Sequence, residues 1–177
     1  MLSGRKVMIL IAVGMVTALS GGVAAQAGGG GAPTVEIVGG IEIAPNEYLQ
    51  LTLRFDPEDV DVASGGRVRW VETADLKEPH TVTIVREGAL PENFEEAEAC
   101  YAPGHACARA LKAHEKKKGV RRVVEAKGSK KGLDEVRDSR WIKPNKTIRP
   151  TISAPAGETL YYLCATHPWM QGSVTTE

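Results

Sequence analysis

The sequence predicts an all-β fold, a β-sandwich with a partly helical insertion, and three observations support this prediction. Short segments with an apolar residue at every second position occur before residue 86 and after residue 149. Gly, Pro, Ser and Asp residues separate these segments at short intervals, as turns between strands do. Neither region has the βαβ rhythm of a parallel sheet. We therefore expect one antiparallel sandwich over residues 35–177, interrupted by an insertion at about 86–149.

The first 27 residues have the pattern of a secretory signal peptide. Arg5 and Lys6 form a short basic region, residues 7–19 are apolar, and small residues follow at the spacing that a signal peptidase accepts. The apolar run is shorter than the roughly 20 residues of a membrane span, and an uncleaved anchor is the alternative. Cleavage of 1–27 predicts an exported protein, periplasmic, extracellular or on the cell surface, with a flexible lead at 28–34.

Three stretches show the predicted strands. In "YLQLTLRF" (48–55), every second residue from Leu49 to Phe55 is apolar, which predicts one half-buried strand. The stretch "VDVASGGRVRWV" (60–71) places a Ser-Gly-Gly turn between two apolar pairs. In "HTVTIV" (80–85) the apolar residues alternate with threonines, which predicts another strand with one buried face.

Two side chains that can bind a metal are expected to point into the core from the tips of strands. His80 begins its strand and has the same parity as Val82, so both should leave the strand on the buried side. Cys164 ends a later strand and has the parity of Tyr162. Both potential ligands therefore lie at strand ends on the core side.

A Cys-x-x-His-x-x-Met motif follows in "CATHPWM". Three extended residues span only about 10 Å, so a loop that curls at Pro168 can bring Cys164, His167 and Met170 around one atom. In the alternative interpretation, the cysteine is an ordinary buried thiol, the methionine fills the core, and His80 is a hydrogen-bonded core histidine. The coincidence of all four favours a metal site.

The chemistry of these four donors indicates copper. A thiolate, two imidazoles and a distant thioether form the set that binds copper in electron-transfer sites. Zinc sites more often use cysteine and histidine without a thioether. Cu(I) favours sulfur and Cu(II) favours imidazole nitrogen, so a rigid mixed site needs little rearrangement when it gains or loses an electron.

The segments "PHTVTI" and "YYLCATHPWMQGSV" resemble the small blue (type 1) copper proteins, the cupredoxin family of plastocyanin, azurin and amicyanin. The ligand loop is most similar to that of amicyanin, because Pro168 follows the second histidine and the methionine comes soon after. The resemblance covers about 35–85 and 150–175. It implies a Greek-key cupredoxin β-sandwich, copper at one end, and one-electron transfer between redox partner proteins. It also implies the copper ligands, which are His80, Cys164, His167 and Met170.

The sequence departs from the family pattern in two places. The family often has Asn after the first histidine, whereas this chain has Thr81, whose hydroxyl cannot supply an amide. The insertion at 86–149 is also far longer than the corresponding connection in amicyanin. The threonine puts in question which hydrogen bonds fix the ligand loop, but it does not affect the prediction of a metal.

The insertion predicts helices at 92–98 and 106–118, the second ending near Gly119, and a further short helix in "GLDEVRDSRW" (132–141). In an exported protein, two nearby cysteines favour a disulfide between Cys100 and Cys107, which leaves Cys164 unpaired. The alternative is a second metal site. Its ligands would be Cys100, His105, Cys107 and His114.

Charge is balanced over the whole chain, with 22 basic and 22 acidic residues, but basic residues crowd into 109–131. This run is either a solvated face or a surface that docks an acidic redox partner. Trp169 is either a packing residue or part of an apolar docking patch around His167. Export and the absence of interleaved aromatic residues disfavour nucleic-acid binding. Membrane contact is expected only if the N-terminal segment stays uncleaved.

These observations predict an electron carrier that is not an enzyme. A copper-binding or delivery protein is the first alternative, and only four Met and four His residues in the chain disfavour it. A small cupredoxin-type copper enzyme is the second. Such enzymes commonly link a second copper cluster through a histidine beside the cysteine ligand, and here Leu163 and Ala165 flank Cys164.

Overall fold

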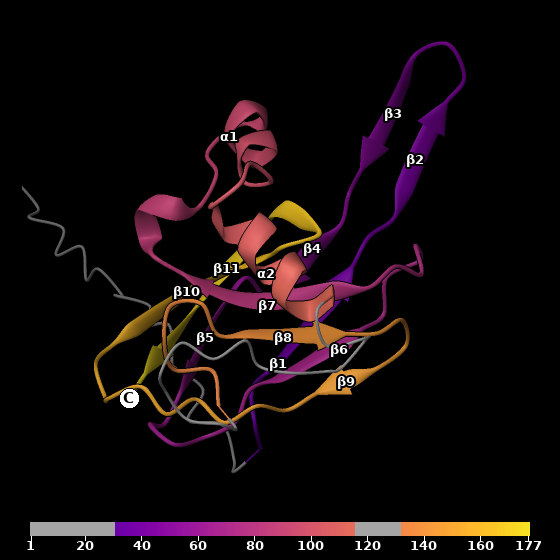
Figure 1. The fold of residues 1–177 in the computed structure, drawn as a ribbon. Helices are drawn as coiled ribbons and strands as arrows, with labels where there is room; N and C mark the ends of the chain where they lie inside the picture. The colour runs from indigo at the N-terminus through magenta and orange to yellow at the C-terminus, as the bar shows by residue number, and fades with distance from the viewer. Residues whose placement is uncertain (1–30, 116–131) are drawn as a thin grey trace, which may run out of the picture. The chain divides into compact units, whose positions relative to one another are not determined.

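The computed structural model describes residues 31–115 and 132–177, and in these the strands form two sheets and a separate hairpin (Figure 1). In spatial order, the first sheet contains β4 (Arg54–Asp56), β1 (Thr34–Val38), β6 (Arg69–Glu72) and β9 (Thr147–Ile148). The second contains β5 (Asp59–Val62), β11 (His167–Thr176), β10 (Thr159–Cys164), β7 (His80–Val85) and β8 (Ser139–Ile142). The hairpin consists of β2 (Ile41–Ala44) and β3 (Tyr48–Leu51). The predicted signal peptide lies outside the described residues.

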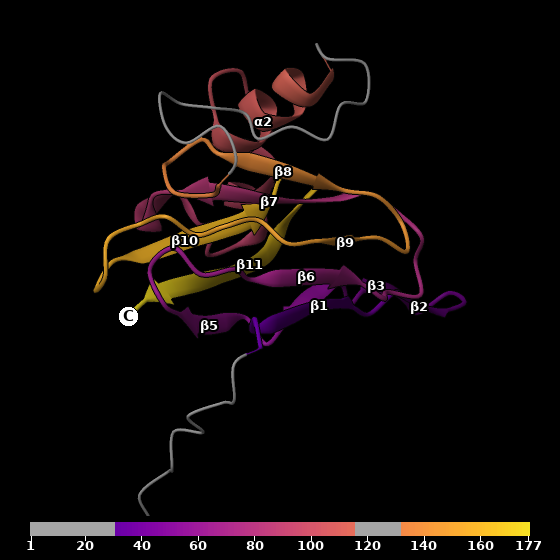
Figure 2. The same ribbon diagram turned by 90° about the horizontal axis from the view of Figure 1, so that it is seen from below.

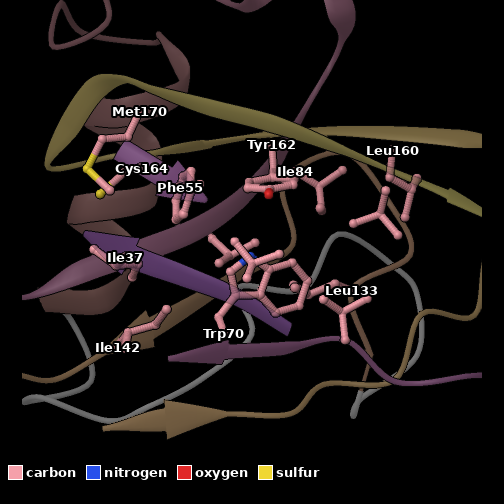
Figure 3. Close-up of a cluster of buried hydrophobic side chains, with 14 of the residues drawn as sticks. Ile37, Phe55, Trp70, Ile84, Leu133, Ile142, Leu160, Tyr162, Cys164 and Met170 are labelled. Atoms are coloured by element: carbon pink, nitrogen blue, oxygen red, sulfur yellow. The ribbon is translucent and has the colours of Figure 1, made fainter. Parts of the chain in front are cut away.

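The core lies between the two sheets and is built around Tyr162 (Figure 3). The ring of Phe55 meets the Tyr162 ring edge-on at a centroid distance of 5.0 Å, and the ring of Trp70 does so at 5.6 Å. The Tyr162 hydroxyl donates a hydrogen bond to the carbonyl oxygen of Glu58 at 2.9 Å. Burying a large apolar side chain contributes about 1.5–3 kcal/mol, so side chains from both sheets stabilise the sandwich.

Both sheets are mixed rather than purely antiparallel. Strand β1 pairs in parallel with β6, and β5 pairs in parallel with β11. The predicted Ser-Gly-Gly turn joins β5 to β6, which belong to different sheets. The turn therefore passes the chain from one sheet to the other, and the expectation of only antiparallel pairs is wrong. Among the described residues, no helix is apolar and long enough to cross a membrane.

The single strand predicted over 48–55 is wrong. Strand β3 ends at Leu51, which is 39% exposed, and β4 begins only at Arg54. Between them, the backbone N–H of Thr52 donates to the carbonyl oxygen of Gly40 at 3.0 Å. The side-chain oxygen of Thr52 accepts a hydrogen bond from the Gly40 N–H at 3.0 Å. These bonds close the base of the β2–β3 hairpin, which projects from the sandwich (Figure 1).

The insertion begins with the 3-10 helix η1 (Glu87–Ala89) and two helices, α1 (Phe94–Ala99) and α2 (Ala106–Glu115). The side chain of Asn93 caps α1 by accepting a hydrogen bond from the Glu96 N–H at 3.0 Å. A disulfide joins Cys100 to Cys107, as predicted. Because both cysteines are in this bond, the alternative of a second metal site that uses them is wrong.

The helical part of the insertion covers the outer face of the second sheet (Figure 2). The disulfide packs in a small buried cluster with Ala110, Val85, Leu163 and Ala165. As a consequence, all six residues of β7 are buried. The prediction of one exposed face on this strand is wrong, because alternation alone does not show what covers the second face.

The last part of the insertion belongs to the sandwich. Ser139–Ile142 forms β8 on the edge of β7, and Thr147–Ile148 forms β9 beside β6. The helix predicted over 132–141 is wrong because the Asp138 carboxylate accepts hydrogen bonds from the N–H groups of Asp134 and Glu135. Arg137 also has a φ of 91°, outside the helical region. The predicted helix end near Gly119 lies outside the described residues, as does most of the basic run at 109–131.

Candidate metal centre

Three buried side chains converge at one end of the sandwich. His80 is the first residue of β7, Cys164 is the last residue of β10, and His167 is the first residue of β11. The Cys164 Sγ lies 3.7 Å from the Nδ1 of His80 and 3.8 Å from the Nδ1 of His167. The two Nδ1 atoms are 3.2 Å apart. His80 and Cys164 are fully buried and His167 is 8% exposed, so the predicted inward orientation is confirmed.

The spacing of these atoms fits a single metal ion. The point at equal distance from the three atoms lies about 2.1 Å from each, and protein metal–nitrogen and metal–sulfur bonds are about 2.0 to 2.3 Å long. The three residues also form a group whose ligand atoms all lie within 4.8 Å of one another. A soft thiolate with two imidazoles is the equatorial donor set of a type 1 copper site.

Met170 reaches the same end of the core from strand β11. Its side chain is fully buried and lies beside that of Cys164 (Figure 3). The expected loop around Pro168 is wrong, because β11 already begins at His167 and the turn consists of residues 165–166. Cys164 and His167 are paired across this turn, which fixes their spacing through the strands.

A sandwich of two sheets with two histidines, a cysteine and a methionine at one end is what the resemblance found in the sequence implies. The two-sheet sandwich and this donor set agree with the cupredoxin fold that the sequence resembles. Neither a protein-family model nor a curated protein matches the chain. The sheet order and the ligand positions of the chain itself support this assignment.

Several solved cupredoxin structures are similar to this chain. Auracyanin A from Chloroflexus aurantiacus is 21% identical, with 83% of this chain and 100% of that chain covered and a TM-score of 0.44. A purple cupredoxin from Nitrosopumilus maritimus is 12% identical, with coverages of 82% and 99% and a TM-score of 0.43. A reduced amicyanin mutant is 17% identical, with coverages of 83% and 83% and a TM-score of 0.42.

Two groups make hydrogen bonds to the Cys164 sulfur of this site. The backbone N–H of Thr81 donates to the Cys164 Sγ at 3.3 Å. The Thr166 hydroxyl lies 3.0 Å from the sulfur and also 3.0 Å from the carbonyl oxygen of Pro79. Because a hydroxyl has one proton, these two acceptors share it. Hydrogen bonds to the cysteine sulfur are among the features that tune such sites.

The side chain of Thr81 ties β7 to the ligand turn. Its hydroxyl accepts a hydrogen bond from the Ala165 N–H at 2.7 Å, although the residue is not the Asn that the family often has. A line of buried hydroxyls continues from it to Thr83 at 2.9 Å and then to Ser139 at 2.8 Å. The Nε2 of His114, on α2, ends this line 2.9 Å from the Ser139 hydroxyl. The insertion is therefore connected to the ligand turn by polar contacts.

The outer edge of His167 meets a carboxylate. Its Nε2 lies 3.0 Å from the Oε2 of Glu78, whose side chain is 45% exposed. An Nε2–H that donates to this carboxylate leaves the Nδ1 lone pair directed toward the site, as in other carboxylate–histidine–metal arrangements. The Trp169 ring lies beside His167 at a centroid distance of 5.2 Å and is 40% exposed.

The histidines lower the pKa of the Cys164 thiol to about 5 in the metal-free site. Burial raises this pKa, but hydrogen bonds and charge interactions with His167 and His80 lower it by more. Burial lowers the pKa of His167, while its contacts with Cys164 and Glu78 raise it, and the net direction is upward. The metal-free site is therefore a thiolate beside a histidine that favours its proton, and a cation can take that proton's place.

Sequence analysis missed three residues of the site: Glu78, Thr166 and Tyr101. Glu78 lies two residues before His80 and Thr166 directly before His167, but their residue types alone do not indicate which ligand they contact. The Tyr101 hydroxyl donates to the carbonyl oxygen of Thr166 at 2.8 Å, which fixes the turn from the insertion. Burial, followed by the charge of Cys164, raises the pKa of Tyr101 to about 12, so it is a hydrogen-bond donor at neutral pH.

Proposed function

We propose that this protein is an electron carrier with one type 1 copper held by His80, Cys164, His167 and Met170. The convergence of the Cys164 sulfur and two imidazole nitrogens within 3.8 Å, at a buried strand end, is the observation that supports it. A bound copper ion supplies one-electron chemistry by cycling between Cu(I) and Cu(II). The chain's own residues hold the ligands in position, supply the negative charge of the thiolate, and leave one edge of the site close to the surface.

Rigidity is the first contribution of the chain. The ligands lie on β7, β10 and β11, whose hydrogen bonds fix the backbone at each position. The Thr81 N–H and the Thr166 hydroxyl hold the sulfur, and the Thr81 hydroxyl holds the ligand turn by accepting a hydrogen bond from the Ala165 N–H. A site that cannot rearrange suits both oxidation states, so little energy is needed to reorganise it when an electron moves.

Access is the second contribution. His80, Cys164 and Met170 are fully buried, whereas His167 is 8% exposed and lies beside Trp169, which is 40% exposed. Electrons are therefore expected to enter and leave at the His167 edge, where redox partner proteins dock. The predicted signal peptide adds export to this proposal, with function in the periplasm, outside the cell or at its surface. Neither nucleic acid nor, after cleavage, a membrane is a proposed partner.

The two alternatives need a more accessible site. A delivery protein must pass copper to another protein, and ligand exchange is slow when the cysteine and methionine are fully buried. A copper enzyme needs an open metal position for substrate, whereas the buried Met170 lies beside Cys164 (Figure 3). The electron carrier remains the function that the geometry supports best.

Adding one equivalent of Cu(II) to the chain from Gly28 onward tests the proposal. We expect an intense absorption band that colours the protein blue and narrow copper hyperfine splitting in the paramagnetic resonance spectrum, because the thiolate binds the metal directly. Cys164→Ser should abolish the band in a folded protein, whereas Val136→Ser, at an exposed site, should leave it unchanged. A colourless, tetragonal copper spectrum from the unmodified protein would contradict the type 1 assignment.

A further inference from the structure

A groove of about 600 Å³ lies beside the metal centre and is not explained by copper binding. Its walls come from Leu49 and Leu51 on β3, from Phe94 on α1, and from Trp169 and Gln171 on β11. In Figure 1, the β2–β3 hairpin and helix α1 both lie above the sheets, and a gap separates the two elements. The hairpin and insertion thus contribute to a surface next to the ligand strand.

The groove presents apolar side chains to solvent. Phe94 is 73% exposed, Leu49 is 63% exposed and Trp169 is 40% exposed. On the same face of the hairpin, Ile43 pairs with Leu49 and is 65% exposed. A contiguous exposed apolar patch of this kind marks an interaction site in a folded protein, since isolated apolar residues would be scattered over the surface.

The charges around the groove are acidic. Its charged lining residues are Glu58 and Glu92. The two segments that border it, 40–51 and 91–99, contain Glu42, Glu47, Glu92, Glu95, Glu96 and Glu98 and no lysine or arginine. A partner that fills the groove must therefore offer apolar side chains surrounded by basic ones.

The groove lies close enough to the proposed copper site to be used in electron transfer. Trp169 lines the groove, and its ring centroid is 5.2 Å from that of the ligand His167. The Gln171 side-chain amide donates to the carbonyl oxygens of Pro91 at 2.7 Å and Pro168 at 3.2 Å. These bonds join the start of the helical segment to the ligand strand, so a docked protein would rest against a fixed surface.

We propose that this groove docks a basic redox protein, whose exposed apolar edge enters between Leu49 and Phe94 while its lysines and arginines face the glutamates. The inference rests on the proposed electron-carrier function and names the partner's chemistry. It also differs from the acidic redox partner that was one of two interpretations of the basic run at 109–131.

Mitochondrial cytochrome c, a basic haem protein, is the probe for the first test. Adding it to the isotopically labelled Cu(I) protein should shift the amide resonances of Leu49, Phe94 and Trp169. Resonances of Val136 and Glu158, which are exposed and do not line the groove, should not shift. Shifts confined to another face, or none at low salt, would overturn the docking proposal. The same titration of the metal-free chain tests docking even if copper does not bind as proposed.

The second test measures reduction of the ferric probe by the Cu(I) protein in stopped flow. Leu49→Ser with Phe94→Ser should lower the second-order rate constant about ten-fold, because the apolar anchors are lost. Glu92→Gln with Glu95→Gln should lower it about three-fold at low salt, and the difference should vanish at high salt. The matched control, Val136→Ser with Glu158→Gln, should keep the original rate.

Oxidation by a neutral small quinone separates docking from copper chemistry. All three double variants should react with it at the rate of the unmodified protein, because it needs no protein surface. If the groove variants slow both reactions equally, they damage the copper site and the docking proposal is wrong. Equal rates for all variants with cytochrome c would also contradict it, while leaving the electron-carrier function intact.

Discussion

The two faces of strand β7 are equally buried but by different chemistry. The inner face presents His80, Val82 and Ile84, and the outer face presents Thr81, Thr83 and Val85. Inner-face apolar residues pack in the core between the two sheets. Outer-face hydroxyls form a hydrogen-bonded line toward α2, and Val85 packs near the disulfide.

The comparison separates two tasks within one strand. The inner face places a ligand at the end of a tightly packed core, where backbone pairing fixes its position. The outer face fixes the turn between the ligands through Thr81, whose hydroxyl accepts the Ala165 N–H. Inner-face changes should therefore alter global stability, whereas outer-face changes should alter the local environment of the copper site.

The largest effect is expected from Ile84→Ala on the inner face. Ile84 is 1% exposed in the main core, and the substitution leaves a cavity that lowers the free energy of unfolding by about 3 kcal/mol. Urea unfolding of the metal-free protein, followed by tryptophan fluorescence, measures this. Val136→Ala at an exposed site is the control and should cost almost nothing. A loss as small as the control's would mean that the inner core is loosely packed.

Replacing both Cys100 and Cys107 with serine should have the next largest effect. Loss of a disulfide that closes a loop of this length lowers the free energy of unfolding by about 2 kcal/mol. Because this cluster packs against Ala165, the amide of Ala165 should also exchange hydrogen faster. Ile84→Ala, measured under the same conditions, is expected to speed exchange only through global unfolding. If the Ala165 amide exchanges hydrogen at an unchanged rate, the disulfide cluster stabilises the insertion but not the ligand turn.

The comparison also explains which parts of the fold could be predicted from the sequence. Alternation correctly located β7 and β10, because it reports which side chains share a face of a strand. It could not show whether that face is covered. Leu49 alternates as a core residue would and yet lies 63% exposed on the hairpin, while Thr83 lies 2% exposed under the insertion. Strands β8 and β9 were missed because their burial depends on pairing with distant strands.

The proposed metal ligands could be found because the motif keeps Cys164, His167 and Met170 close in sequence and His80 begins a recognisable strand. The residues that tune the site follow no such spacing. Tyr101 bonds to a carbonyl 65 residues away, and Glu78 bonds to His167 across 89 residues. Such contacts depend on how the strands and the insertion pack, which local patterns do not record.

The smallest effect on stability, and the sharpest test of the outer face, is expected from Thr83→Val. The Thr83 hydroxyl lies 2.9 Å from that of Thr81 and 2.8 Å from that of Ser139, so valine removes the middle of the line with little change of shape. The free energy of unfolding should fall by about 1 kcal/mol, the net worth of a typical hydrogen bond. The Thr81 hydroxyl would lose one partner beside the ligand turn, and the visible band of the copper protein should shift.

Thr175→Val is the matched control for this change, because Thr175 shares a hydroxyl contact with Thr159 at an exposed position far along β11 from the ligands. It should leave the visible band where it is. If Thr83→Val shifts the band and the control does not, the outer face acts on the site through Thr81, and the insertion is part of the machinery that sets the copper environment. If the two variants behave alike, the hydroxyl line only stabilises the outer layer, and the ligand turn is fixed by the strands and Tyr101 alone.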